Sequence, residues 1–188
     1  MKIIKQLLFV VFALILLSSN CKKDNQAPQT ELAKLPPITQ IGANTFGCLI
    51  NGQAFVPGSN IFLASHKQCN YIFSGGGYYF TILVYNTDNT GLVTQVSIQT
   101  DSLLIAQGQT LLLKDYTKGN ANASYAMITN ANGINRYDTN NSVTGQLTIT
   151  KLDPVKQIVS GTFYFNAVNA AGVMVTVTDG RFDMPYTQ

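Results

Sequence analysis

Residues 173–183, with the sequence VMVTVTDGRFD, decide the fold class of this chain. Every second residue in the first half of this stretch is a valine, so three valines fall on one face of an extended strand. The Asp179-Gly180 pair after them predicts a turn. Residues 161–167 (GTFYFNA) and 146–150 (QLTIT) alternate in the same way. Alternation over several neighbouring segments indicates an antiparallel sheet with one face in water.

The preceding part of the chain contains more short β-rich runs, separated by Gly, Asn and Asp. Asn51-Gly52 supplies the two positive-φ positions of a type I′ turn and predicts a hairpin. Only residues 102–107 (SLLIAQ) predict a short helix. The expected fold is therefore all-β: a single antiparallel β-sandwich or open barrel formed by residues 39–188. Its further strands are expected at residues 46–50, 53–56, 78–85, 93–98, 123–129 and 134–137.

The amino terminus has a different composition. Residues 7–17 (LLFVVFALILL) are apolar without interruption and follow Lys2 and Lys5. A membrane-spanning helix needs about 20 apolar residues, so this run is too short to be one. A short apolar run behind a basic start is typical of a secretory signal peptide, which we assign to residues 1–20. A buried core helix is the alternative, but the run has no polar face.

The residues that end this run, Ser18-Ser19-Asn20-Cys21, resemble a lipobox, in which the Cys receives a diacylglycerol group. Leu17 lies one place before the position that Leu usually occupies in this motif. Ordinary cleavage is the alternative and needs small residues at −3 and −1, which a cut before Asn20 or before Cys21 would not provide. We therefore predict lipidation of Cys21. The resulting membrane attachment places the chain in the cell envelope. We expect the outer membrane and exposure on the surface, and lipidation by itself leaves the membrane and the leaflet open.

The chain has three cysteines, an odd number that calls for an explanation in a secreted protein. Lipidation of Cys21 accounts for one of them. Cys48 and Cys69 remain as a candidate disulfide in an oxidising compartment. The alternative is two buried free thiols, because Cys is among the residue types most often buried.

Residues 21–38 are polar and charged and contain three of the six prolines. Such a composition holds too little apolar surface to fold alone, so we expect a flexible tether between the membrane and the domain. Without Lys2 and Lys5, the 12 basic residues of the whole chain become 10, against 9 acidic ones. This near-neutral balance, without a basic cluster, argues against a nucleic-acid partner.

Motifs at both ends of the β-domain resemble a domain of Bacteroidota lipoproteins. They are residues 42–52 (GANTFGCLING) with Phe55-Val56-Pro57 at one end, and residues 145–153 (GQLTITKLD), 160–165 (SGTFYF) and 178–183 (TDGRFD) at the other. That family has no assigned activity, so the resemblance implies a lipoprotein with a β-fold and transfers no catalytic residues. Lys22-Lys23-Asp24 also resembles the charged export signal that follows the lipidated Cys in this phylum.

The domain has few residues suited to catalysis. His66 is the one histidine, and no G-x-S-x-G motif is present, so a Ser/His/Asp hydrolase would depend on His66 alone. Glycosidases need two carboxylates, yet the turn accounts for Asp179, and Asp183 fits a strand end. We expect no enzyme activity and no cofactor.

Metal binding is not expected either. His66, Cys48 and Cys69 lack the spacing of a zinc site. Residues 86–91 (NTDNTG) resemble the first half of a calcium loop, but the Glu of its second half is missing. A polar turn is the simpler interpretation, as it is for residues 138–142 (DTNNS).

Tyrosines are abundant and can stack on sugars or on partner surfaces, although many must belong to the core. The candidates are Tyr71, Tyr78, Tyr79, Tyr85, Tyr116, Tyr125 and Tyr137. We expect a membrane-anchored envelope lipoprotein whose β-domain is non-catalytic and is structural or contacts other envelope proteins. The alternative is a surface lipoprotein that captures a glycan or a small ligand, which predicts a concave face lined with tyrosines. The sequence leaves the ligand-binding residues unknown.

Overall fold

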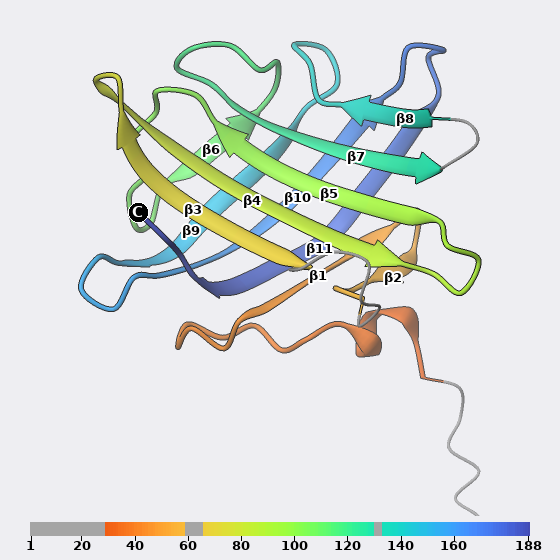
Figure 1. Ribbon diagram of the computed structural model, residues 1–188, viewed down its shortest axis with the longest axis horizontal. Helices are drawn as coiled ribbons and strands as arrows, with labels where there is room; N and C mark the ends of the chain where they lie inside the picture. Colours follow the sequence, from red (N-terminus) through yellow and green to blue (C-terminus); the bar gives the residue numbers. More distant parts are fainter. Residues whose placement is uncertain (1–28, 59–65, 130–132) are drawn as a thin grey trace, which may run out of the picture.

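A computed structural model describes residues 29–58, 66–129 and 133–188 (Figure 1). The predicted signal peptide and Cys21 lie outside these ranges. The described elements are η1 (Glu31–Lys34), a 3₁₀ helix, and the strands β1 (Thr45–Ile50), β2 (Gln53–Phe55), β3 (Lys67–Ser74), β4 (Gly77–Thr87), β5 (Val93–Thr100), β6 (Thr110–Leu113), β7 (Ala121–Thr129), β8 (Gly133–Asp138), β9 (Gly145–Asp153), β10 (Ile158–Val168) and β11 (Met174–Pro185). No helix within the described ranges is long and apolar enough to cross a membrane. The predicted all-β class is confirmed.

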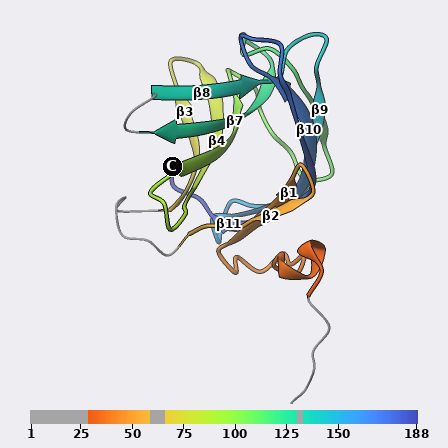
Figure 2. The same cartoon turned by 90° about the vertical axis from the view of Figure 1, so that its right-hand side faces the viewer.

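The strands form one curled sheet in the order β2-β1-β11-β10-β9-β6-β7-β5-β4-β3, and β8 pairs with both β7 and β10. Neighbouring strands are antiparallel except β6 and β7, which meet in parallel. Figure 2 shows the two halves of the sheet facing each other. The edge strand β3 reaches the chain beyond β11, where the amide of Tyr71 donates to the carbonyl of Thr187 at 2.8 Å. The architecture is thus an open barrel, joined at one end by this seam.

The concave side of the curled sheet holds the apolar core. Alternate residues of β4, β5, β9, β10 and β11 are buried there, as the periodicity predicts. They are Phe80, Ile82, Val84, Val96, Ile98, Leu147, Ile149, Phe163, Phe165, Val175 and Val177. Val173, the first valine of the expected stripe, lies before β11 and is exposed. Full burial of a Phe or Ile side chain contributes about 1.5–3 kcal/mol, so these stripes dominate the stability of the domain.

The predicted local elements have different outcomes. The hairpin at Asn51-Gly52 is confirmed, because both residues have positive φ, 48° and 81°. The predicted helix at residues 102–107 is wrong: this segment is an irregular connection, and the amide of Leu103 donates to the carbonyl of Tyr78 at 2.9 Å. The strands β3 and β6 were not predicted, since neither alternates strictly in sequence over more than four residues.

The predicted turn at Asp179-Gly180 is also wrong, because β11 runs without a break through both residues. The register of β11 against β10 shifts between the pairs Phe163–Gly180 and Phe165–Val177, so the extra residue forms a β-bulge. Asp179 has φ 54°, which Asp tolerates in a bulge as it does in a turn. A Cβ at Gly180 would lie 2.5 Å from the ring of Phe163, so only Gly fits there.

Asp183 is a buried carboxylate that joins three segments of the chain; it is 1% exposed. Its Oδ1 accepts hydrogen bonds from the amide of Gly42 and from the hydroxyl of Ser160, both at 2.8 Å. Its Oδ2 accepts from the hydroxyl of Thr39 at 2.6 Å and from the amides of Ile41 and Ala43 at 3.0 Å each. Burial alone raises the pKa of Asp183, but the hydrogen bonds from Thr39 and from the amides of residues 41–43 outweigh it and hold the pKa well below its usual range.

The motifs at the two ends of the domain meet at this carboxylate. Residues 42–52 supply two of the amides, residues 160–165 begin with Ser160, and residues 178–183 end with Asp183 itself. In register, Asp183 lies opposite Thr45 of β1 on one side and Ser160 of β10 on the other. This side chain therefore joins the two distant parts of the sequence, beside the backbone pairing of β1 with β11.

The segment before β1 also contacts the sheet. Glu31 of η1 accepts a hydrogen bond at Oε2 from the amide of Ala54 in β2, at 2.9 Å. Leu35 is buried, and a Cβ at Gly47 would lie 2.6 Å from the ring of Pro36. Residues 29–38, which belong to the expected tether, thus lie partly against β1 and β2. The boundary between the tether and the β-domain stays a prediction.

We expect Asp183→Asn to lower the free energy of unfolding by about 2–3 kcal/mol, because the amide group would turn a donor toward donors that now bind a carboxylate. Asp179→Asn is the matched control, since Asp179 is exposed and its carboxylate holds no such network. Urea unfolding of both variants at neutral pH measures the difference. Equal stability of the two variants would contradict the role given to Asp183.

The difference in unfolding free energy between the unmodified chain and Asp183→Asn should depend on pH, and its direction follows from the pKa of Asp183. A carboxylate with a depressed folded-state pKa contributes stability that is complete above its unfolded pKa of about 3.9. The contribution is lost as the pH falls from there through the folded-state pKa. The stability gap between the unmodified chain and Asp183→Asn should therefore be constant near neutral pH and should shrink below about pH 4.

Candidate functional site

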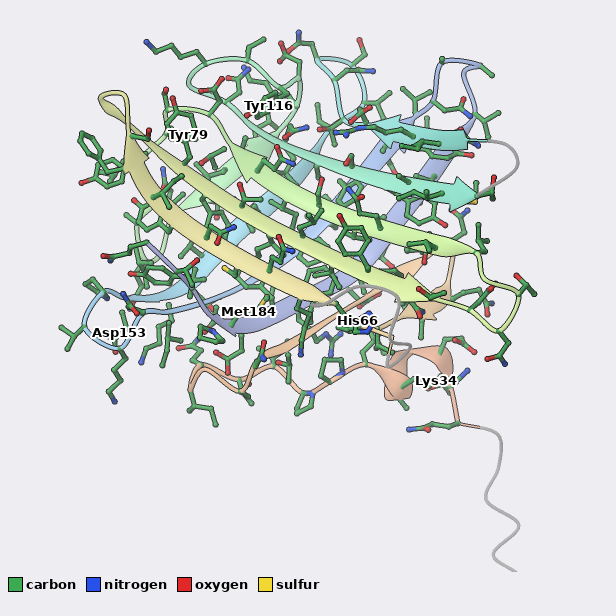
Figure 3. The ribbon with its side chains drawn as sticks, in the orientation of Figure 1. Lys34, His66, Tyr79, Tyr116, Asp153 and Met184 are labelled. Carbon is green, nitrogen blue, oxygen red and sulfur yellow. The ribbon has the colours of Figure 1, made fainter. Side chains whose placement is uncertain are left out.

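A groove of about 570 Å³ opens at one end of the open barrel, beside the seam between β3 and the chain after β11. The β3–β4 and β9–β10 turns both reach this end, where Figure 3 labels Tyr79 and Asp153. We call it the end groove. It is lined by Tyr71, Ile72, Phe73, Tyr78, Leu104, Ile105, Leu152, Pro154, Tyr186 and Gln188. None of these side chains is charged.

Aromatic rings form one wall of the end groove. The ring of Tyr71 lies 5.4 Å from that of Tyr78 and 5.9 Å from that of Tyr186, measured between centroids. Phe73 and Tyr78 are 4.9 Å apart. Tyr71 also meets Phe80 of the core edge-on at 6.4 Å, so the wall continues into the hydrophobic core. Contacts of this geometry fix the rings in place before any ligand arrives.

The opposite side of the end groove comes from the connection between β5 and β6. The amide of Ile105 donates to the hydroxyl of Tyr71 at 3.3 Å, and the hydroxyls of Tyr79 and Ser102 lie 3.0 Å apart. Burial raises the pKa of Tyr71, so this phenol stays neutral at physiological pH. The groove is therefore lined by uncharged, mostly apolar side chains.

The rim of the end groove leaves large apolar side chains in water. Phe73 is 64% exposed, Leu104 is 58% exposed and Ile72 is 38% exposed. Single exposed apolar residues are ordinary, but Phe73 and Leu104 line the same groove, which is typical of an interaction site. Ile72 pairs with Tyr79 and belongs to the other face of the sheet. An apolar partner that covers the rim would remove the side chains of Phe73 and Leu104 from water, which favours binding.

The structure brings only some of the candidate tyrosines together. Tyr71 and Tyr78 line the end groove, whereas Tyr79 lies on the other face of β4. Phe80 is fully buried, as the alternation of Tyr78 and Phe80 against Tyr79 requires. The other candidates lie elsewhere: Tyr85 on β4, Tyr116 exposed in the β6–β7 connection, and Tyr125 and Tyr137 in a ring pair between β7 and β8 at 5.8 Å.

Sequence reasoning missed Phe73 and Tyr186 as groove residues. Phe73 belongs to β3, the strand that was not predicted, and Tyr186 follows β11, which was expected to end earlier. Recognition of residues 67–74 as a strand paired to β4 would have placed Phe73 beside Tyr78. Nothing local indicates Tyr186, because the seam that brings it to Tyr71 joins the two ends of the domain.

Cys48 and Cys69 are both free and buried in the structure. Cys48 lies on β1 and Cys69 on β3, and both belong to the apolar core. Burial raises the pKa of Cys69 to about 12 and also raises that of Cys48. Reactive thiols have lowered pKa values, so neither position has the character of a nucleophile.

The remaining candidate residues form turns. Asp88 accepts hydrogen bonds at Oδ1 from the amides of Thr90 and Leu92, which close the β4–β5 turn. Asn140 accepts from the amides of Ser142 and Val143. Among the described residues, no group of three or more Cys, His, Asp or Glu side chains could hold a metal ion.

We expect both core thiols to resist labelling in the native protein, because burial suppresses the thiolate that reacts. The test uses the Cys21→Ser variant without reductant, and counts thiols with a chromogenic disulfide reagent at pH 8. Two thiols should react within minutes in urea and at least about 100-fold more slowly in native buffer. No reactive thiol in urea would mean that Cys48 and Cys69 form the alternative disulfide.

Comparison with known proteins gives a family without an assigned role. No curated protein and no solved structure matches the chain significantly. Residues 81–184 match a family described as a domain of unknown function, DUF6252. The match extends over more than half of the sequence, from within β4 to the end of β11, and so includes Asp183 and most of the curled sheet. The chain belongs to the DUF6252 family.

Proposed function

We propose that this chain is a lipid-anchored protein of the cell envelope whose β-domain is a non-catalytic binding module. The anchor is the lipid on Cys21, in the outer membrane, and the domain faces the cell surface. The signal-like amino terminus and the lipobox-like residues before Cys21 support the anchor. The end groove supports the binding role, and its occupant is an apolar segment of another envelope protein.

The chemistry of the end groove favours such a partner. None of its ten lining side chains is charged, and Phe73 and Leu104 at its rim are more than half exposed. A protein segment with apolar side chains could cover the rim and fill the groove at the same time. A sugar would need several polar groups for its hydroxyls, and the groove offers few of them.

A small apolar ligand is the second candidate. A volume of about 570 Å³ lies within the range of about 300–1,000 Å³ that is usual for small-molecule pockets. The fixed aromatic wall around Tyr71 would suit a flat apolar molecule. The exposed rim favours the protein partner, because a molecule inside the groove would leave Phe73 and Leu104 in water.

The lipid anchor predicts a specific mass. Purified from a lipoprotein-processing bacterial host, the protein should begin at Cys21 and carry the mass of a diacylglyceryl group with or without an amide-linked acyl chain. The Cys21→Ser variant should lack the modification and should keep residues 1–20, because no neighbouring position suits ordinary cleavage. Intact-protein mass spectrometry makes the measurement, and an unmodified Cys21 would refute the anchor.

If the end groove binds a protein partner, polar substitutions at its rim should weaken the binding of that partner. Affinity purification of the full chain from native membranes should recover one envelope protein in constant ratio. Leu104→Ser and Phe73→Ser should each reduce that recovery at least about tenfold, because the apolar contacts are lost. Both side chains are more than half exposed, so neither change should unfold the domain.

Met174→Ser is the matched control for these variants. Met174 is 54% exposed, begins β11 and does not line the end groove. It should leave the recovery unchanged. Equal recovery with Leu104→Ser, Phe73→Ser and the unmodified chain would exclude the groove as the docking site.

A further inference from the structure

A second hollow lies on the outer face of the sheet, over β9, β10 and β11. It has a volume of about 280 Å³ and is lined by Ile38, Gln146, Thr148, Thr162, Phe163, Tyr164, Asp179, Gly180 and Arg181. We call it the outer hollow. It shares no lining residue with the end groove. Its composition differs as well, because six of its side chains carry hydrogen-bonding groups.

The strand registers place these groups around one aromatic ring. Tyr164 of β10 pairs with Gln146 of β9, and Thr162 pairs with Thr148 on one side and Arg181 on the other. Neighbouring outward residues of paired strands lie about 4.5–5.5 Å apart at Cβ. Tyr164 is 50% exposed, so its ring stands among these polar side chains with a face open to water.

The β-bulge of β11 places an acidic side chain, that of Asp179, at the outer hollow. Asp179 is the residue with positive φ in the bulge, opposite the stretch of β10 that contains Tyr164. A bulge re-aims a side chain that a regular strand would direct elsewhere, and here Asp179 lines the outer hollow. The Nε of Arg181 donates to the backbone carbonyl of Asp179 at 3.1 Å. This hydrogen bond holds the guanidinium of Arg181 near Asp179.

Several of these polar side chains form no hydrogen bond with other described residues. In the described part of the chain, the side chains of Gln146, Thr162, Tyr164 and Asp179 make no hydrogen bond to protein. The two terminal nitrogens of Arg181 are also without a protein partner in these residues. The site therefore offers donors from Arg181, acceptors from Asp179, and groups of both kinds from Gln146 and Thr162.

From this arrangement we infer that the outer hollow binds a neutral carbohydrate. One face of a pyranose ring presents C–H groups, which can pack on the exposed ring of Tyr164, while the hydroxyls around its edge both donate and accept. Asp179 and Arg181 balance each other in charge, so a strongly anionic ligand would meet the carboxylate without a surplus of cations. The volume of about 280 Å³ lies just below the range of about 300–1,000 Å³ that is usual for small-molecule pockets, which favours a single sugar unit in the hollow.

The test uses the full chain in detergent on an array of neutral oligosaccharides of glucose, mannose, galactose and xylose, with uronic-acid oligosaccharides as a second set. At least one neutral oligosaccharide should bind, and titration calorimetry with it gives the Kd. Tyr164→Val keeps a strand-forming residue but removes the ring, and should raise the Kd at least about tenfold. Tyr164→Phe keeps the ring and should change the Kd less than about threefold.

Controls separate this site from the rest of the surface. Asp179→Asn should raise the Kd about fivefold, since Asn tolerates the positive φ but removes the charge-assisted acceptor. Tyr116→Val should leave the Kd unchanged; Tyr116 is 54% exposed and does not line the hollow. Phe73→Ser should also leave it unchanged, which makes the result independent of the end groove.

Three results would overturn the inference. They are no binding to any neutral oligosaccharide by protein whose thermal unfolding is normal, binding confined to the uronic-acid set, and an unchanged Kd in Tyr164→Val. In the third case, loss of binding in Phe73→Ser would show that the sugar binds at the end groove instead of the outer hollow.

Discussion

The carboxylate of Asp183 is the interaction on which the arrangement of this domain depends. It is buried without a cation among the described residues and is held by two hydroxyls and three backbone amides. Because each amide comes from the short segment before β1, the bonds fix the path by which the chain enters the sheet. A neutral side chain of the same shape could not accept all five hydrogen bonds, so the charge is essential to the geometry.

The entry path set by Asp183 has consequences at both candidate binding surfaces. It places β1 against β11, and residues 35–38 then run across the outer face, where Ile38 borders the outer hollow. Thr187, two residues after the end of β11, forms the seam with β3. That seam brings Tyr186 to Tyr71 and so completes the aromatic wall of the end groove. The end groove is lined by uncharged side chains, whereas the outer hollow includes Asp179 and Arg181.

Much of the fold was predictable from the sequence because the pattern is local. The alternation at residues 146–150 and 161–167 correctly predicts which side chains face the core, and Asn51-Gly52 correctly predicts a hairpin. Local patterns failed where one signal fits two structures. Asp-Gly supplies a left-handed residue to turns and bulges alike, so the Asp179 bulge was predicted as a turn. Residues 102–107 are apolar enough for a helix, yet Ser102 and Leu103 form hydrogen bonds with Tyr79 and Tyr78 of β4, and the segment is irregular instead.

The candidate sites were less predictable, and the reason is distance along the chain. The tyrosines could be counted, but the sequence does not show that Tyr71 meets Tyr186, 115 residues later, or that Tyr164 stands beside the bulge at Asp179. By itself, the sequence determined the β-class, the inward stripes and the inventory that argues against catalysis, since all of these follow from residue type and short-range spacing. Only the tertiary structure decided the role of Asp183, the seam and the two hollows, because each is made by strands that meet through the curl of the sheet.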